Sequence, residues 1–113
     1  MKELRDIVIA FNNERDWDQF HSPKNLAMAL MVEMAELLEH FQWISEEQSR
    51  NLSSSKKEHI SEEIGDVLIY LVNLADKLGI DPIQAAKNKI KQNHKKYPAA
   101  TSRGKSLKYD EYE

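Results

Sequence analysis

Residues 26–38 read LAMALMVEMAELL, and Glu33 and Glu36 are the only members of this run that are not apolar. A second run, IGDVLIYLVNL at residues 64–74, carries one acid within it and another directly before it. Because side chains three positions apart lie on the same face of an α-helix, each acidic pair occupies one face of its helix. An isolated ionised carboxylate in an apolar interior costs on the order of tens of kcal/mol, so such groups are normally neutralised, paired or metal-bound. Two facing pairs therefore predict a cation site.

The residue types indicate which cation the site would prefer. Four ionised carboxylates, from Glu33, Glu36, Glu63 and Asp66, carry a charge that two divalent ions would cancel. Oxygen-only ligands suit Mg²⁺, Mn²⁺ or Ca²⁺ better than zinc, and Mg²⁺ commonly completes its shell with water and substrate phosphates. The alternative is a set of surface acids or acids paired with lysines. The nearly continuous apolar surface of the first run argues against this alternative, because such a helix must be buried. A magnesium site of this kind predicts that the protein acts on a phosphate compound.

Other acids and the histidines add little to this site. Glu39 and Glu62 each stand one turn from a candidate ligand, so each could be a further ligand or a base, but a solvated helix edge is the favoured interpretation. A di-iron carboxylate bundle would need Glu-x-x-His motifs. No histidine of the chain has a glutamate three residues before it: His21, His40, His59 and His94.

The composition limits the class of protein. With 113 residues the chain has the size of one domain, and so small a core gains from burying surface against another copy. A net charge of -3 offers no basic field for nucleic acid. The absence of cysteine excludes disulfides and suits a reducing compartment. The N-terminus is too charged for a signal peptide, and glutamates interrupt the longest apolar stretch, so we expect a soluble, cytoplasmic protein without a membrane span.

Apolar spacing and the positions of glycine and proline predict an all-α protein. We expect four helices, from about residues 2 to 14, 23 to 43, 55 to 78 and 82 to 96. They would form an antiparallel four-helix bundle that assembles into oligomers. The predicted domain covers residues 1–98, and residues 99–113 lack apolar periodicity and are expected to form a flexible tail.

Local signals support these helix boundaries. Ser22 before Pro23, and likewise Asp81 before the next proline, are typical of a capping residue followed by the first helical position. Ser55 and Glu58 have the spacing of a capping box. Gly79 stands where the third helix is expected to end.

The order of these motifs resembles the MazG-like family of all-α nucleoside triphosphate pyrophosphohydrolases, which carry E-x-x-E on one helix and E-x-x-D on the next. Here the motifs read Glu33-Met-Ala-Glu36 and Glu63-Ile-Gly-Asp66. The likeness covers almost the whole chain, through ERDWDQFHSPKNL, VEMAELLEHFQW, EEIGDVLIYLV and NHKKYP, and is nearest to the dCTP pyrophosphatase branch. Many members double the first glutamate, whereas Val32 stands at that place here.

The resemblance implies a reaction and a metal. The four acids would hold Mg²⁺, for which Mn²⁺ could substitute, and a (deoxy)nucleoside triphosphate would be cleaved to the monophosphate and pyrophosphate. Lys89, Asn93 and Lys96 fall on one face of the last long helix, and the resemblance implies that they hold the triphosphate. The alternative is that they belong to a solvated lysine face.

Aromatic residues flank the first acidic helix. Trp17, His21 and Trp43 stand at its two ends, where rings could stack on a base. The resemblance implies that both tryptophans line a base pocket and that Tyr70, one turn after Asp66, lies near the sugar. The alternative for each ring is a place in the core.

These observations predict a homodimer or homotetramer whose active site is completed by a neighbouring subunit. The favoured function is house-cleaning hydrolysis of dCTP or a modified dCTP. Two alternatives remain open: the same reaction on dUTP or a broad range of NTPs, and a non-catalytic helical module that binds metal or nucleotide. Neither a nucleic acid polymer nor a membrane is expected as a partner.

Overall fold

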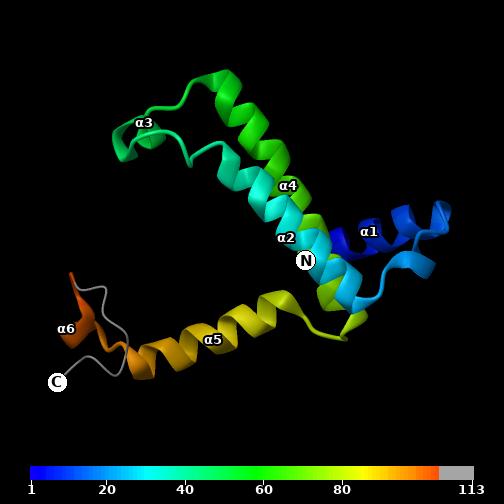
Figure 1. The fold of residues 1–113 in the computed structure, drawn as a ribbon. Coiled ribbons are helices and arrows are strands. Elements are labelled where there is room, and N and C mark those ends of the chain that lie inside the picture. Colours follow the sequence, from blue (N-terminus) through cyan, green and yellow to red (C-terminus); the bar gives the residue numbers. More distant parts are fainter. Residues whose placement is uncertain (105–113) are drawn as a thin grey trace. The chain divides into compact units, whose positions relative to one another are not determined.

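The fold is entirely helical across residues 1–104, which the computed structural model describes (Figure 1). Four long and three short helices occupy this part of the chain: α1 Lys2–Glu14, η1 Asp18–Phe20, α2 Pro23–Glu39, α3 Glu46–Arg50, α4 Ser54–Lys77, α5 Pro82–Lys96 and α6 Ala99–Ser102. The chain divides into two compact units, Met1–Ile80 and a second that begins at Asp81. The prediction of an all-α protein with four long helices is confirmed.

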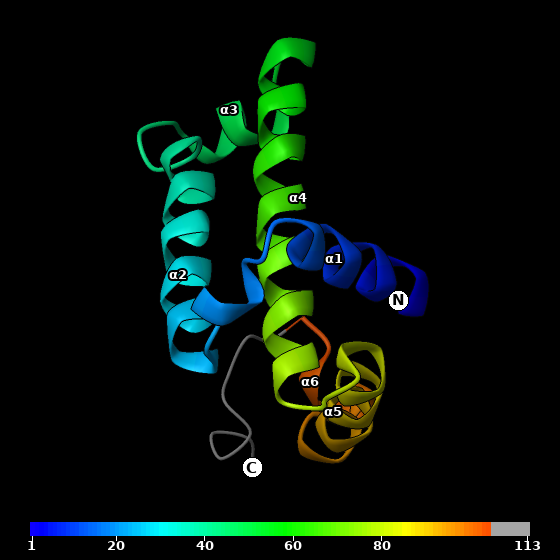
Figure 2. The same cartoon turned by 90° about the vertical axis from the view of Figure 1, so that its right-hand side faces the viewer.

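The core of the first unit lies between α2 and α4, which run antiparallel and side by side in both views (Figures 1 and 2). Leu26 of α2 is 1% exposed and Val72 of α4 is 2% exposed. Burying a side chain of this kind contributes roughly 1.5–3 kcal/mol. Glu33 follows Leu26 by two helical turns, so the same contact that buries Leu26 directs Glu33 towards α4.

Helix α1 packs across α4 and completes the first unit (Figure 2). Val8 of α1 and Ala75 of α4 are both buried. At the edge of this contact, Arg5 Nε lies 3.8 Å from Asp76 Oδ1, which adds a partly exposed ion pair. Packing against α1 and packing against α2 thus both depend on α4.

The α2–α4 connection differs from the prediction. Helix α2 ends at Glu39, whereas we expected it to continue to about residue 43. The N–H groups of Phe41 and Gln42 both donate to the Leu38 carbonyl, at 2.8 and 3.0 Å, and a hydrogen-bonded turn follows the helix there. Local hydrogen bonds therefore end the regular helix before the apolar residues that follow Glu39.

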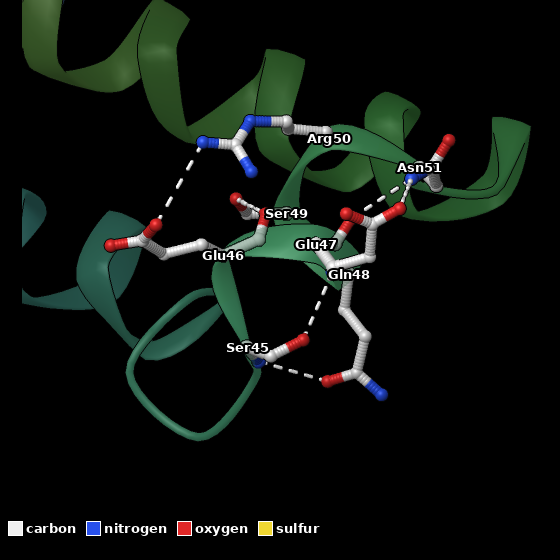
Figure 3. Close-up of polar contacts among 7 residues, drawn as sticks. All are labelled: Ser45, Glu46, Glu47, Gln48, Ser49, Arg50 and Asn51. Atoms are coloured by element: carbon white, nitrogen blue, oxygen red, sulfur yellow. Dashed lines mark hydrogen bonds and ion pairs between the residues drawn. The ribbon is translucent and has the colours of Figure 1, made fainter.

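A short helix, α3, occupies the connection that we expected to be mainly loop (Figure 3). Ser45 and Gln48 form a capping box: the Gln48 N–H donates to Ser45 Oγ at 3.1 Å, and the Ser45 N–H donates to Gln48 Oε1 at 2.9 Å. The predicted capping box at Ser55 and Glu58 is wrong. Ser53 caps α4 instead, because its Oγ accepts the Lys56 N–H at 3.1 Å.

Helix α5 begins at the residue that the sequence predicts. Gly79 has φ +66°, the left-handed conformation that commonly ends a helix. Asp81 Oδ1 accepts the N–H groups of Ile83 and Gln84 at 2.9 and 3.1 Å, so the predicted cap of α5 is confirmed. The expected tail starts with helix α6, and residues 105–113 of that tail lie outside the described part of the chain.

Candidate functional site

The two acidic motifs meet at the interface of α2 and α4. Glu33, Glu36 and Glu63 each offer one carboxylate oxygen, and the three oxygens lie within 4.8 Å of one another. Glu33 and Glu63 are partly buried, and Glu36 is exposed. Glu36 and Glu63 lie on different helices, so their approach depends on the packing that the sequence predicted for these faces. We call these three residues, together with Asp66, the acidic cluster.

Two oxygens of the acidic cluster are sealed from solvent without a partner. Glu33 Oε2 and Glu63 Oε2 are buried and accept no hydrogen bond from any described residue. Native structures satisfy nearly all buried polar atoms, so an orphaned pair at one place calls for a ligand. Both oxygens belong to hard donors of the type that binds divalent cations.

Electrostatics in the cluster favour protonation when no cation is bound. Burial is the main cause that raises the pKa of Glu33, followed by contact with Glu36 and by the charges of the other cluster acids. Burial likewise comes first in raising the pKa of Glu63, and the charges of Glu36 and Asp66 raise it further, while His40 opposes the shift. Crowded carboxylates repel one another, and a cation removes that repulsion.

These observations fit a metal ion. The ligand set contains only carboxylate oxygens, two of these oxygens have no partner among the described residues, and burial together with crowded negative charge raises the pKa values of Glu33 and Glu63. Oxygen-only sets favour magnesium, calcium or manganese over softer metals. The acidic cluster is therefore a candidate divalent metal site.

Asp66 connects the acidic cluster to a cavity of about 300 Å³ in the first unit. Its carboxylate raises the pKa of both Glu33 and Glu63, and it also lines the cavity. The other lining residues come from α1, from the segment before α2 and from α4: Leu4, Ile7, Val8, Phe11, Asn12, Trp17, His21, Ile69, Tyr70 and Asn73. An apolar cavity with a few polar groups is the usual form of a small-molecule site.

Three of the predicted base and sugar residues line this cavity. Trp17, His21 and Tyr70 lie in it together, although they come from separate parts of the sequence. Trp17 packs edge-on against Phe11, with ring centroids 5.6 Å apart at 69°. The Arg15 guanidinium lies 3.6 Å from the Phe11 ring centroid and so adds a cation–π contact to this wall.

Contacts from the segment before α2 hold the cavity wall in place. Asp18 accepts from the Lys77 ammonium in an ion pair between η1 and α4. Asn73 Nδ2 lies 3.1 Å from His21 Nδ1, a second link to α4. The Trp17 N–H donates to the Asn12 carbonyl at 3.0 Å, which turns the chain back after α1. Trp17 and His21 are thus positioned by tertiary contacts.

Sequence reasoning missed the two asparagines of the cavity. Asn12 and Asn73 are 6% and 4% exposed, the only buried polar residues in the described range. Each interrupts an otherwise apolar stripe of its helix. A polar residue within an apolar run indicates a buried polar group, and Asn73 is such a residue in the run at residues 64–74.

The remaining predicted site residues lie elsewhere. Trp43 follows α2, is 86% exposed and does not line the cavity. Lys89, Asn93 and Lys96 lie on α5 in the second unit, where their side chains are exposed. Glu39 and Glu62 are exposed, as expected for helix edges. No helix within the described residues is both long and apolar enough to cross a membrane.

The chain is similar in sequence to known proteins and in structure to a solved one. The chain is 41% identical to dCTP pyrophosphatase 1 of Bos taurus over 96% of its length and 41% identical to that of Homo sapiens over 98%. It spans about 66% of the length of each of these relatives. A pyrophosphatase from Archaeoglobus fulgidus, solved by crystallography, matches with a TM-score of 0.82 and 46% identity, over 87% of this chain and 92% of that one.

The match to a family model includes both acidic motifs. Residues 28–112 match the model of the MazG-like family, and this range holds Glu33, Glu36, Glu63 and Asp66. The resemblance predicted from the sequence, including the likeness to dCTP pyrophosphatases, is confirmed. With its acidic helices paired as the motifs require and the greater part of its length matched, the chain belongs to the MazG-like family.

Proposed function

We propose that the protein is a Mg²⁺-dependent pyrophosphohydrolase that cleaves dCTP, or a modified dCTP, to the monophosphate and pyrophosphate. Such a reaction would remove unwanted nucleotides from the cellular pool. The observation that carries the proposal is the shared position of Asp66, which belongs to the acidic cluster and also lines the aromatic cavity. A nucleoside triphosphate matches this arrangement, because its phosphates could bind a metal at the acidic cluster while its base occupies the aromatic cavity.

The acidic cluster would supply the metal end of the site. Glu33, Glu36, Glu63 and Asp66 would hold Mg²⁺ in their ionised forms, which the crowding of the cluster disfavours until a cation binds. When bound, Mg²⁺ supplies charge neutralisation for phosphate oxygens and an acidified water. A carboxylate of the cluster would accept a proton from the attacking water.

The cavity would supply the nucleoside end. Trp17 presents a ring on which a base could stack, and Tyr70, one turn after Asp66 on α4, would lie near the sugar. His21 lines the same cavity. The names of the relatives, dCTP pyrophosphatase 1, support cytosine as the base.

Helix α5 would contribute the cations that hold the triphosphate. Lys89, Asn93 and Lys96 share one helical face, and charge-assisted hydrogen bonds to phosphate are among the stronger polar contacts. Substituting Lys89 by Ala should raise the KM for the triphosphate. Lys91→Ala, on another face, is the matched control.

Product analysis tests the proposed reaction. The protein is incubated with Mg²⁺ and a panel of NTPs and dNTPs, and the products are separated by ion-exchange chromatography or observed by ³¹P NMR. The monophosphate and pyrophosphate, formed only with metal and fastest from dCTP, are expected. Release of inorganic phosphate with a diphosphate would contradict the proposal.

Two alternatives have distinct outcomes in the same experiment. Fastest turnover of dUTP, or similar turnover of every nucleotide, would keep the reaction and replace the substrate. Binding without turnover would favour the non-catalytic module.

We further propose that the active unit is a homodimer or homotetramer. Helix α2 leaves an apolar stripe largely uncovered, with Met28, Met31, Val32 and Leu38 at least 56% exposed. These residues recur at helical spacing on one face, which is the pattern of a surface that packs against another protein. Ile64 of α4 is 53% exposed as well. A second copy of the chain would cover these faces.

Trp43 would make the active site depend on the oligomer. It would enter the cavity of a neighbouring subunit, since its own unit leaves it 86% exposed. Light scattering at micromolar concentration should report a dimer or tetramer, and a monomer would contradict this part of the proposal. Met31→Lys should dissociate the oligomer and reduce activity together, whereas Lys24→Glu at an exposed position of α2 should change neither.

A further inference from the structure

Two buried asparagines lie in the wall of the largely apolar and aromatic cavity. Asn12 of α1 and Asn73 of α4 are 94% and 96% buried, as their exposed fractions are 6% and 4%, and both line the cavity. Burying an amide without a hydrogen bond is energetically unfavourable. Residues of this type in such a place need a partner.

The Asn12 side-chain amide is unpaired within the described part of the chain. No side-chain hydrogen bond joins it to any described residue, and its amide atoms are not among those sealed from solvent in this part of the chain. Asn12 itself is one of the residues that line the cavity. The Asn12 amide thus offers a donor group and an acceptor that no described residue uses.

The Asn73 amide is held in one orientation. Its Nδ2 lies 3.1 Å from Nδ1 of His21, so Nδ2 donates and the neutral ring nitrogen accepts. The Asn73 Oδ1 is left as an acceptor. The same contact fixes the His21 ring, which also lines the cavity.

We propose that Asn12 and Asn73 determine base specificity by reading the hydrogen-bonding edge of a pyrimidine. This role rests on the proposed function, because it assigns the ligand of the same cavity. A pyrimidine edge alternates donors and acceptors, and cytosine presents an amino group where thymine presents a carbonyl oxygen. Asn73 Oδ1 takes a donor of the base, and Asn12 meets the neighbouring atom with its amide.

The apolar part of the cavity wall cannot discriminate strongly between one pyrimidine base and another. A hydrophobic pocket discriminates weakly between ligands of similar size, whereas buried polar groups penalise a ligand that leaves them unpaired. Trp17 accepts any base face by stacking, so it contributes affinity without choosing the base. Each of the two amides offers a donor and an acceptor side by side, the arrangement that a base edge also presents.

The test replaces each amide by an apolar group of similar shape. Asn12→Leu and Asn73→Leu are compared with the wild type in kcat/KM for dCTP, dUTP, dTTP and dATP in the presence of Mg²⁺. The ratio between the preferred base and the next is expected to fall by about tenfold in each variant, since one hydrogen bond is typically worth about a factor of ten. Asn13→Ala, at the exposed neighbouring position, should leave the ratio unchanged.

A second substitution guards against loss of folding. Asn12→Asp keeps the shape and polarity but removes the donor, so the order of preferred bases should change while circular dichroism stays that of the wild type. Retention of the wild-type base ratios in Asn12→Leu and Asn12→Asp would overturn the proposal. A wild type that hydrolyses all dNTPs equally well would overturn it too.

The proposed function and this inference fail separately. If the wild type turns over no triphosphate, binding of dCMP, dUMP and dTMP is measured by calorimetry. A base-dependent Kd in the wild type that becomes base-independent in Asn12→Leu supports the inference even then. Equal Kd values for all three monophosphates in the wild type would refute it.

Discussion

The acidic cluster and the cavity wall lie side by side on α4 but are built in different ways. The cluster takes its residues from two helices, each of which supplies an i,i+3 pair: Glu33 with Glu36, and Glu63 with Asp66. The cavity takes its residues from α1, from the segment around η1 and from α4, and tertiary contacts hold them together. Helical periodicity determines the first arrangement, whereas the second depends on how distant segments meet.

The acidic cluster and the cavity wall also have different effects on the stability of the folded state. The acidic cluster stores electrostatic repulsion and two orphaned oxygens, so it costs stability in the absence of a metal. The cavity wall contains ring contacts, an ion pair and a hydrogen bond that favour the folded state. Substitutions in the two regions should therefore have opposite effects on folding.

The largest effect is expected from Glu63→Gln. Loss of one cluster carboxylate should lower kcat/KM by about two to four orders of magnitude, as for other groups that act directly in the chemistry. The metal-free variant should nevertheless melt at a higher temperature than the metal-free wild type, because repulsion in the cluster is reduced. Steady-state kinetics and differential scanning calorimetry with EDTA measure the two quantities.

The control for this variant is Glu62→Gln, at the exposed neighbouring position. It should change neither activity nor melting temperature. A lower melting temperature for metal-free Glu63→Gln would mean that the cluster stabilises the fold, and the contrast with the cavity wall would then be lost.

An intermediate effect is expected from Trp17→Ala in the cavity wall. Stacking on an aromatic ring contributes roughly 1–3 kcal/mol per base, so kcat/KM should fall by about 5- to 150-fold. Mg²⁺ affinity, measured by calorimetry, should stay the same because Trp17 is not part of the acidic cluster. Phe20→Ala, a 61% exposed aromatic in the same segment, is the control. Equal losses in both variants would argue against stacking.

The same contrast explains how much the sequence could predict. The four long helices, the caps at Ser22 and Asp81, and the facing acidic motifs follow from local spacing, and the structure contains them. Trp17 and Tyr70 were selected by family resemblance and His21 by its place beside the acidic helix, and the structure places all three on one cavity. Their grouping depends on packing between α1 and α4, which no local pattern reports.

The misses have physical causes. The end of α2 and the cap of α4 both depend on competing local hydrogen bonds. Ser53 and Ser55 are equally suited to cap a helix by residue type, and the geometry of the preceding turn decides that Ser53 caps α4. Asn12 and Asn73 interrupt apolar stripes in the sequence, but the extent of their burial appears only when α1 meets α4. Whether Trp43 and the α5 residues contribute to the site stays a prediction.

A smaller effect is expected in the pH dependence of stability without metal. Glu33 and Glu63 have pKa values raised above the ordinary value of 4.5, so the folded state binds more protons than the unfolded state between the ordinary and the raised values. The contribution of these groups to the free energy of unfolding is therefore present below the ordinary pKa and is lost as pH rises through the raised one.

Urea unfolding in EDTA across this pH range measures the effect. The comparison with Glu33→Gln isolates it, since that variant should lose part of the decline with rising pH. Saturating Mg²⁺ should reverse the trend, because a metal binds the ionised carboxylates and stabilises the folded state more at higher pH. An identical pH dependence with and without Mg²⁺ would contradict metal binding at the cluster.

The smallest effect on stability is expected from Asp18→Asn, which breaks the ion pair between η1 and α4. The Asp18 side chain is 56% exposed, so the pair should contribute at most about 1 kcal/mol to the free energy of unfolding. Its loss should nevertheless raise KM several-fold with kcat little changed, because Trp17 and His21 flank Asp18 and depend on the position of this segment. Asp6→Asn, which removes an exposed pair with Arg5 on α1, should leave KM unchanged. An unchanged KM in Asp18→Asn would mean that the Asn73–His21 contact alone positions the segment, and the cavity wall would then depend on one tertiary contact instead of two.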